Sequence, residues 1–434
     1  MRIVVGIAGS RGDVQPVIEI ATALHRRGHA VKMFAPKQFE ETITGRGIDA
    51  GYFNTDSQQL MGSLDQGFKS AHNILKWATA AMVDQFEKLI PATAGADALL
   101  TAVNEIGAAT VAQYRQIPHF RMGYCPFLPG DQVPPVVPLT VNLPTSANRL
   151  MWQGVDLATK FLFGKTLDGK RRELGLPKIG KVTDYSAGTS HNLLAYDPLL
   201  SPPARGWKYQ YDYVGYPFGG DEGALPPEVE EFLAAGPAPV YLGFGSVIVP
   251  NPDEITGMIL AAVRRAGCRA IVGQGWTGLG KNVTSLPKEV MLLGPSPHRT
   301  LFPRMAGIVH HGGSGTTHNA ARAGVPQAVI PQILDQYYWG KRVFELGIGP
   351  APVPLTRLTE AKLTRMLAGV LEPTCARQAK TVGGLIREDG AQVAAGIIEA
   401  ALSGRKADQA ESRSPISLHR VRASPEGTAS GNAG

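Results

Sequence analysis

The amino-acid sequence predicts an α/β protein with two domains, each built on a doubly wound parallel sheet. Short apolar runs alternate with helical stretches over residues 1–122, and the same alternation starts again at residue 240. Strands that alternate with helices form parallel sheets that are covered on both faces. The chain has 434 residues, of which 44% are hydrophobic and 18% charged, so it is long enough to bury two separate cores.

The first domain begins with a β-loop-α-β unit. An apolar run at residues 3–7 leads through a glycine-rich turn into a helical stretch from Val14 to Arg27, and Gly28 follows where a C-cap glycine is expected. A second apolar run covers residues 30–34. Further along, the pattern predicts a strand at 96–101, a helix near 107–114 and a strand at 117–122.

A proline-rich segment at residues 125–144 interrupts this pattern. Its prolines exclude a central strand and most of a helix, and a loop of this length in a compact domain is usually functional. A helical region that contains Trp152 follows and runs to about residue 176. Residues 215–239 are rich in Gly, Pro and acidic side chains, which is typical of a connection between domains.

The second half of the chain repeats the alternation. We expect strands at 240–246, 269–273, 290–294, 307–311 and 327–331, and helices at 253–266, 315–323 and 336–346. The predicted domains are 1–215 and 239–385, joined by a linker at 216–238 and followed by a helix at 386–403 that is able to pack back on the first domain. Residues 404–434 have the composition of a disordered tail, either native or left from cloning.

Composition narrows the possible functions. The net charge of +7 is modest, and no basic stripe is interleaved with aromatic residues, so nucleic acid is not an expected partner. Cys125, Cys268 and Cys375 lack the spacing of a zinc site or a disulfide framework, which fits the reducing cytoplasm. No stretch approaches the ~20 apolar residues of a spanning helix, so any membrane contact would be peripheral. The sequence does not indicate an oligomeric state.

The stretch from Ile308 to Arg322 reads I-V-H-H-G-G-S-G-T-T-H-N-A-A-R and predicts an anion-binding site. Glycines turn the chain tightly after a strand, and a helix then begins whose free N–H groups and dipole attract phosphate. Ser314, Thr316 and a histidine can add donors. A simpler interpretation stays open, in which His310 and His311 end a buried strand and Ser314 caps the helix.

The first loop, G-I-A-G-S-R-G-D-V-Q-P, lacks the dinucleotide-binding fingerprint. Its glycines do not follow the G-x-G-x-x-G spacing, and the second strand ends without the acidic residue that would hold a ribose, which disfavours hydride transfer with NAD. Asp13 stands just before a helical stretch that contains Pro16. It is therefore either a helix cap or a carboxylate that faces the cleft, and the residues alone favour neither.

These motifs together resemble glycosyltransferase family 1, in the branch that holds sterol glucosyltransferases and bacterial transferases of antibiotics and glycolipids. The resemblance rests on G-S-R-G-D-V-Q-P, G-F-G-S, G-W-T-G-L, the stretch from Leu301 to Thr317, and G-V-P-Q-A-V-I-P-Q-I-L-D-Q, in this order over residues 1 to about 402. It is loose over 52–235, where such enzymes hold the acceptor. The resemblance implies the GT-B fold, in which two Rossmann-like domains face a cleft.

Carried over residue by residue, the resemblance implies a site for a UDP- or dTDP-sugar donor in the second domain. Trp276 would stack on the nucleobase beside His298, and Asp335 with Gln336 would bind sugar hydroxyls, which mildly favours UDP-glucose. The diphosphate would be held by Ser246, His310, Gly312, Gly313, Ser314, Gly315 and Thr316. Core packing of Trp276 and helix capping by Asp335 are the alternatives.

The implied reaction is an inverting transfer of a hexose to a hydroxyl, with no metal ion and no cofactor. Asp13, in a loop with Ser10, Arg11 and Gly12, would take the hydroxyl proton, while His310 and the helix N-terminus would stabilise the leaving diphosphate. Many family members carry histidine where this chain has Asp13. An exposed aspartate has a pKa of ~3.9 and is a weak base, so an apolar cleft must raise that pKa.

We expect an apolar acceptor, such as a sterol, a polyketide, a macrolide or a lipid. The candidate wall residues are Trp77, Phe127, Val133, Val136 and Trp152, each of which could equally be ordinary core. Two alternatives keep the fold: a sugar-nucleotide 2-epimerase, which would consume the donor alone, and a non-catalytic accessory protein, which would have lost the donor residues. The sequence leaves open the acceptor, the sugar and the hydroxyl that is modified.

Overall fold

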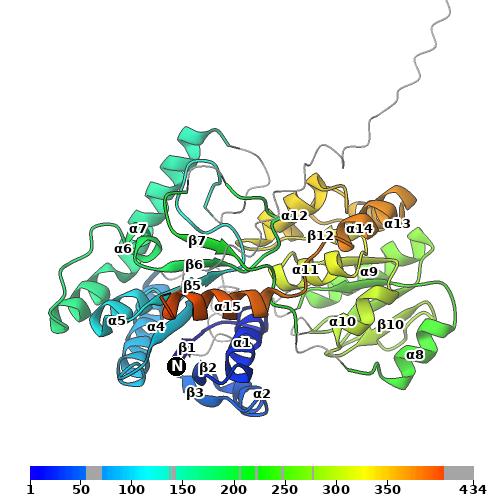
Figure 1. Cartoon of the computed structure of the whole chain (residues 1–434). Coiled ribbons are helices and arrows are strands. Elements are labelled where there is room, and N and C mark those ends of the chain that lie inside the picture. Colours follow the sequence, from blue (N-terminus) through cyan, green and yellow to red (C-terminus); the bar gives the residue numbers. More distant parts are fainter. Residues whose placement is uncertain are drawn as a thin grey trace, which may run out of the picture.

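The chain forms two α/β lobes (Figure 1). The computed structural model describes residues 1–54, 71–135, 138, 143–204, 207–219, 223–245, 249–275 and 278–404. Within them, one sheet has the strand order β3-β2-β1-β4-β5-β6-β7 and the other has the order β10-β9-β8-β11-β12. All neighbouring strands run parallel. The predicted fold class is therefore confirmed.

The N-terminal lobe contains the longer sheet and most of the long helices. Its strands are β1 (Arg2–Gly6), β2 (Ala30–Pro36), β3 (Asp49–Phe53), β4 (Ala98–Ala102), β5 (His119–Gly123), β6 (His191–Leu194) and β7 (Tyr211–Tyr213). Its helices are α1 (Arg11–Arg26), the 3₁₀ turn η1 (Lys37–Phe39), α2 (Glu40–Thr44), α4 (Ala71–Ala92), α5 (Ala108–Arg115), α6 (Thr145–Glu173) and α7 (Val182–Gly188). The described part of the segment at 125–144 forms neither helix nor strand before α6 begins.

The C-terminal lobe repeats the alternation on a smaller scale. Its strands are β8 (Val240–Gly243), β9 (Ala270–Gly273), β10 (Val290–Leu293), β11 (Gly307–His310) and β12 (Gln327–Val329). Its helices are α8 (Pro227–Ala234), α9 (Pro252–Ala266), α10 (His298–Leu301), η2 (Phe302–Arg304), α11 (Ser314–Arg322), α12 (Gln336–Glu345), η3 (Leu355–Arg357), α13 (Glu360–Leu371) and α14 (Pro373–Gly383). The last helix of the chain, α15 (Gly390–Leu402), returns to the N-terminal lobe.

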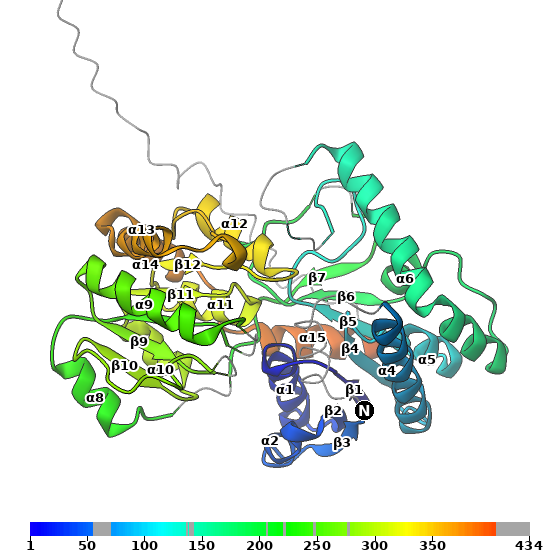
Figure 2. The same cartoon turned by 180° about the vertical axis from the view of Figure 1, so that it is seen from behind.

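Each face of the N-terminal sheet is covered by its own set of helices (Figure 1 and Figure 2). On one face, alternate strand residues such as Ile3 and Val5 pack with α1 and with Ile398 of α15. On the other face, Val4 and its neighbours pack with Phe86 of α4 and with parts of α5 and α6. Burial on both faces explains why the strands are continuous apolar runs rather than alternating ones.

The predicted linker at 216–238 includes an ordered helix. Leu225, Val229 and Leu233, on and beside α8, are buried in one cluster with Tyr241 and Phe302 of the C-terminal lobe. The acidic side chains of this segment lie on the outer face of the helix, which explains why composition alone indicated a linker. Residues after Ala224 therefore pack as part of the C-terminal lobe.

The two lobes share a buried cluster of their own. Tyr196 and Leu200, from the loop after β6, pack with Trp339 of α12 and Ile386. The backbone N–H of Asp197 donates to Nε2 of His318 at 3.2 Å, and the ring of His318 stacks on Tyr216 with centroids 4.7 Å apart. Burial lowers the pKa of His318 to about 4, so the ring is neutral at physiological pH. These contacts fix the orientation of one lobe against the other.

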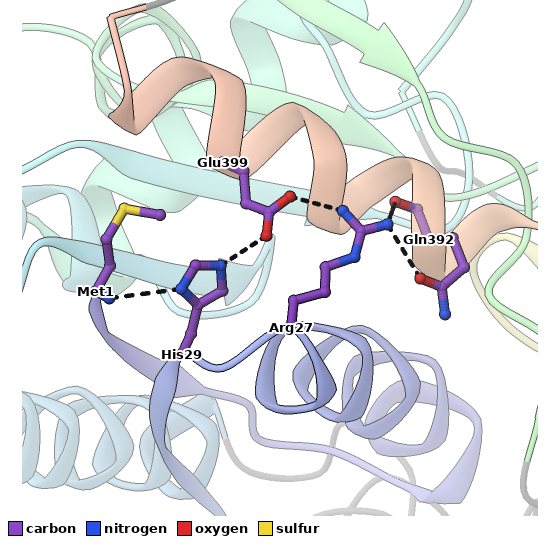
Figure 3. A network of polar contacts seen from close by, with 5 residues as sticks. All are labelled: Met1, Arg27, His29, Gln392 and Glu399. Carbon is purple, nitrogen blue, oxygen red and sulfur yellow. Dashed lines mark hydrogen bonds and ion pairs between the residues drawn. The ribbon is translucent and has the colours of Figure 1, made fainter.

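A polar network ties α15 to α1 and the start of β2 (Figure 3). The carboxylate of Glu399 accepts from Arg27 Nη1 at 2.7 Å and lies 2.7 Å from Nε2 of His29. Arg27 Nη2 also donates to the backbone oxygen and the side-chain oxygen of Gln392 at 3.0 and 3.1 Å. The network joins the two ends of the described chain.

Residues 404–434 were predicted to form a disordered tail, and those after Gly404 lie outside the described residues. Across the described parts of the chain, no helix combines the length and the apolarity needed to cross a bilayer.

Replacing Glu399 with alanine should lower the free energy of unfolding by about 1 kcal/mol at pH 7, because one carboxylate pairs with Arg27 and bonds to His29 in a partly exposed network. Burial opposes ionisation of Glu399, but hydrogen bonds from His29 and Arg27 outweigh it and hold its pKa below the ordinary range. The stabilisation is therefore present above the unfolded-state pKa of ~4.3 and is lost as the pH falls through the lower folded-state pKa.

Urea denaturation at several pH values measures this difference. Glu173→Ala is the matched control, because Glu173 pairs only with Lys170 on an exposed helix end, and it should change stability by less than about 0.5 kcal/mol. A Glu399→Ala effect that grows as the pH falls below 4 would contradict the assignment.

Candidate functional site

The loop after β1 presents the carboxylate of Asp13 in the first turn of α1. Oδ2 of Asp13 accepts from the backbone N–H of Ser10 at 2.8 Å and from its hydroxyl at 2.9 Å. Gly9 has φ of +134°, and a Cβ there would lie 2.5 Å from the same oxygen. Arg11 and Gly12 are exposed at the start of the helix. The capping role and the cleft-facing role of Asp13 are therefore compatible in one conformation.

Burial raises the pKa of Asp13 above its ordinary value, although hydrogen bonds from Ser10 oppose the shift. The side chain is half-buried, so it keeps access to the cleft. Tyr124, just after β5, donates its hydroxyl to the backbone oxygen of Asp13. A carboxylate with a raised pKa and a fixed backbone has the properties of a general base.

A second carboxyl, that of Glu105, lies behind the Asp13 loop and was not predicted from the sequence. Its oxygens accept backbone N–H bonds from Ala8 at 2.8 Å and from Ala102 at 2.9 Å, and the residue is 2% exposed. Burial, with a smaller contribution from the charge of Asp13, raises the pKa of Glu105 to about 8 against these hydrogen bonds. Near neutral pH this group is mainly protonated.

In the C-terminal lobe, the loop between β11 and α11 has the form of an anion site. Gly312 has φ of +92°, and a Cβ there would lie 2.6 Å from Val329 and 2.8 Å from the backbone oxygen of Gln336. The first intrahelical bond of α11 runs from Thr317 N–H to Gly313 oxygen. The N–H groups of Ser314, Gly315 and Thr316 therefore have no acceptor within the helix and are available to an anion.

His310 braces this loop from inside the protein. Its Nδ1 accepts the Gly312 N–H at 3.0 Å, so Nε2 carries the proton and donates to Oε1 of Gln327 at 3.0 Å. The side chain is fully buried, and burial lowers its pKa to about 3. Both ring nitrogens are thus engaged within the protein, and a direct contact of the ring with a diphosphate stays a prediction.

His311, the next residue, faces the mouth of the loop. A Cβ at Gly245 would lie 3.0 Å from its ring and one at Gly313 would lie 2.4 Å from its Nε2. Among the described residues Nδ1 is buried without a hydrogen-bond partner, and burial, with the charge of His298, lowers the pKa to about 4. The sequence shows two adjacent histidines, but only the alternation of side chains at the end of β11 distinguishes them.

The turn between β12 and α12 holds the two predicted sugar-binding residues. Oε1 of Gln336 accepts the N–H groups of Gln332 at 2.8 Å and Ile333 at 3.1 Å, so this carboxamide closes the turn. Asp335 is half-buried. Burial, and then the charge of Asp13, raises its pKa to about 7. Asp13 and Asp335 come from opposite lobes, and the charge of Asp13 acts on Asp335.

The predicted acceptor residues have different surroundings. Phe127 is buried in the cluster between the lobes, and its ring fills the space beside Gly123. Trp152 of α6 donates from Nε1 to the backbone oxygen of Val133 at 2.9 Å, so these two residues do lie together. Trp77 belongs to α4, but its side chain is outside the described part of the structure.

Three further predicted residues cannot be placed. Ser246, Trp276 and Val136 lie outside the described residues.

His298 of α10 stacks on Phe302 with ring centroids 4.3 Å apart and lies edge-on to Tyr241 at 5.9 Å. Its ring is thereby held at the same end of the sheet as His311. Among the described side chains, no cluster of three or more His, Cys, Asp and Glu residues could hold a metal ion.

Replacing Gly9 with alanine should lower the free energy of unfolding by about 1–3 kcal/mol and displace the Asp13 carboxylate, because the new methyl group would meet it in a backbone conformation that favours glycine. Thermal denaturation and a crystal structure of the variant would measure both effects. Gly12→Ala, whose Cβ would lie 3.7 Å from Ser10 Oγ, is the control and should be nearly neutral. Equal stability of the two variants would contradict the strain argument.

Comparisons with known proteins agree with this geometry. Residues 3–120 match the glycosyltransferase family 28 N-terminal domain, and residues 249–391 match the C-terminal domain of erythromycin biosynthesis protein CIII-like proteins. The vancomycin aglycone glucosyltransferase of Amycolatopsis orientalis is 33% identical over 94% of this chain and 99% of its own length. A sterol 3-beta-glucosyltransferase of Arabidopsis thaliana is 29% identical over 91% of this chain and 67% of its own length.

The solved structures that match have the same two-lobed fold. The glycosyltransferase VinC, determined in complex with dTDP, superposes with a TM-score of 0.65 over 94% of this chain and 100% of its own, at 20% identity. Two parallel-sheet lobes, family models on both lobes and near full-length relatives show that this chain is a GT-B glycosyltransferase of family 1, in the branch that contains antibiotic and sterol glycosyltransferases.

Proposed function

We propose that this enzyme is an inverting, metal-independent glycosyltransferase that moves a hexose from a UDP- or dTDP-sugar to a hydroxyl group of an apolar acceptor. The observation that carries the proposal is the N-terminus of α11, where the first N–H groups have no acceptor within the helix. Asp13, whose pKa is raised by burial, would supply the base, and Asp335 would contact the sugar.

The donor would bind mainly to the C-terminal lobe. The N–H groups that open α11 would hold the diphosphate, and the helix dipole favours the negative charge that develops as it leaves. His311 would add a neutral imidazole at the same place, since its Nδ1 is otherwise unpartnered among the described residues. The dTDP complex of VinC and the glucosyltransferase names of two relatives support a sugar nucleotide as the donor.

The acceptor hydroxyl would be activated by Asp13. The hydroxyl oxygen attacks the anomeric carbon of the sugar, and the hydroxyl proton passes to the carboxylate of Asp13. The bond from the anomeric carbon to the diphosphate breaks, and its electron pair leaves with the nucleotide. One displacement of this kind inverts the anomeric centre. Because burial raises the pKa of Asp13, the group is a stronger base than an exposed aspartate.

An apolar acceptor is supported by the relative that is named for sterols, while another relative is named for vancomycin aglycone. The acceptor would enter from the N-terminal lobe, where the loop from Cys125 to Pro135 and the Trp152–Val133 contact lie. The epimerase alternative needs no acceptor groove, and the accessory alternative needs no raised pKa at Asp13. Both remain testable.

A two-stage experiment tests the class of reaction. Thermal-shift measurements with UDP-, dTDP- and GDP-sugars identify the donor, and mass spectrometry then follows acceptors incubated with it. A mass gain of one hexose on an apolar acceptor is the expected result. Conversion of the donor to an epimer with no acceptor present would instead establish the epimerase, and donor binding without any turnover would establish an accessory role.

Asp13→Asn should lower kcat by at least 10²-fold and change the Kd of the nucleoside diphosphate by less than about 3-fold. Asparagine keeps an oxygen for the Ser10 N–H but cannot take a proton. In the wild type, kcat/KM should fall as the pH drops through the raised pKa of Asp13, because the base must be ionised. The same acid limb in Asp13→Asn would refute the assignment of Asp13 as the base.

His311→Ala and His310→Ala should separate donor binding from stability. His311→Ala should weaken the binding of UDP or dTDP by at least about 10-fold with a small change in stability, because only the loop mouth is altered. His310→Ala should cost about 2–4 kcal/mol of unfolding free energy, because it removes two buried hydrogen bonds and leaves a cavity. Isothermal titration calorimetry and urea denaturation measure the two quantities, and unchanged nucleotide binding by His311→Ala would exclude that role.

A further inference from the structure

A half-buried arginine in the N-terminal lobe, Arg121, has no evident role in the reaction described above. Arg121 lies on β5, in register with Thr101 of β4, two residues before Gly123 at the end of the strand. Its guanidinium carbon lies 5.0 Å from the centre of the Phe127 ring. Nη1 is buried and has no hydrogen-bond partner, and among the described residues no carboxylate lies within ion-pair distance of the guanidinium.

The carboxyl group of Glu105 does not neutralise Arg121. The charge of Glu105 favours the cationic form of Arg121, but both oxygens of Glu105 already accept backbone N–H bonds from Ala8 and Ala102. Burial also keeps Glu105 mainly protonated near neutral pH, whereas Arg121 stays charged with a pKa of about 10. Among the described residues, the positive charge of Arg121 is therefore not balanced by an ion pair.

The surroundings of Arg121 belong to the acceptor half of the molecule. Tyr124 and Phe127 follow it directly in the chain, and Tyr124 holds the backbone of Asp13. The amides assigned to the donor diphosphate are on α11 of the opposite lobe. A buried donor group without a partner is costly in a folded protein and is commonly satisfied by a ligand when it lies at a functional site.

We propose that Arg121 selects the acceptor, and that its guanidinium binds a carboxylate on an otherwise apolar acceptor molecule. This inference rests on the proposed glycosyl transfer and narrows its acceptor class. An aromatic acid with a hydroxyl group fits the charge of Arg121 and the ring of Phe127 together. A neutral sterol would leave Arg121 unpaired and should be the poorer acceptor.

Binding of three fluorescent probes in the presence of UDP tests the proposal with the full chain. The probes are 2-naphthol, 3-hydroxy-2-naphthoate and 6-hydroxy-2-naphthoate, which share the ring system and the hydroxyl but differ in the carboxylate. We expect the wild type to bind at least one of the acids 10-fold or more tightly than 2-naphthol at pH 7. Arg121→Met should lose this preference and keep its affinity for 2-naphthol within about 3-fold.

Arg149→Met is the matched control, because Arg149 lies on α6 near the same loop, is 67% exposed and pairs with Asp131 at 3.1 Å. It should keep the preference for the acid. Arg121→Gln serves as a second variant, and circular dichroism with thermal denaturation verifies that each variant is folded. A wild type without preference for either acid overturns the proposal whatever the variants do, and so does a preference that survives in both Arg121 variants.

The outcome separates this proposal from the proposed function. Arg121-dependent binding of the acid without any sugar transfer would support the acceptor site and refute the transferase. Transfer of sugar to 2-naphthol and to the acids alike, with no effect of Arg121→Met, would support the transferase and overturn the acceptor selection. Equal loss of UDP binding and of all three probes in the folded Arg121 variants would also overturn it.

Discussion

The buried contact between the lobes is the constraint on which the site depends. His318 lies in α11, the helix whose N-terminus forms the predicted anion site. Its ring accepts the backbone N–H of Asp197 from the other lobe and stacks on Tyr216. His318 also bonds through Nδ1 to the backbone oxygen of Ser314 at 2.7 Å. The same ring therefore joins the first turn of α11 to the opposite lobe.

Desolvation is the second common factor. The pKa of Asp13 is raised, that of Asp335 is raised to about 7 and that of Glu105 to about 8, in each case chiefly by burial. Three ionised carboxylates would repel a nucleoside diphosphate and one another. Because Glu105 is mainly protonated and Asp335 partly so at neutral pH, the cleft can accept an anionic donor while one carboxylate remains as the base.

Periodicity and turn residues predicted most of the fold but less of the site. The strand and helix pattern of the second half was confirmed closely, because each element is a short apolar run bounded by glycine or proline. The helix α8 was missed, since its exposed acidic side chains mask the two buried apolar residues Val229 and Leu233 in the sequence pattern. Asp13 was identified, but Glu105 and Arg121 were not, because a lone charged residue after or within a strand has no pattern until the sheet places its neighbours.

The turn before α12 contains a leucine in an unfavourable backbone conformation. Leu334 has φ of +46°, which is unfavourable for a residue with a side chain by about 1–2 kcal/mol, and it is 59% exposed. The turn is closed by Gln336, whose oxygen accepts two backbone N–H groups, so the strain at Leu334 is imposed by those bonds. A glycine there would relieve the strain but would also free the backbone next to Asp335. The leucine instead restricts the backbone next to Asp335, because a residue with a side chain has fewer accessible backbone conformations than glycine.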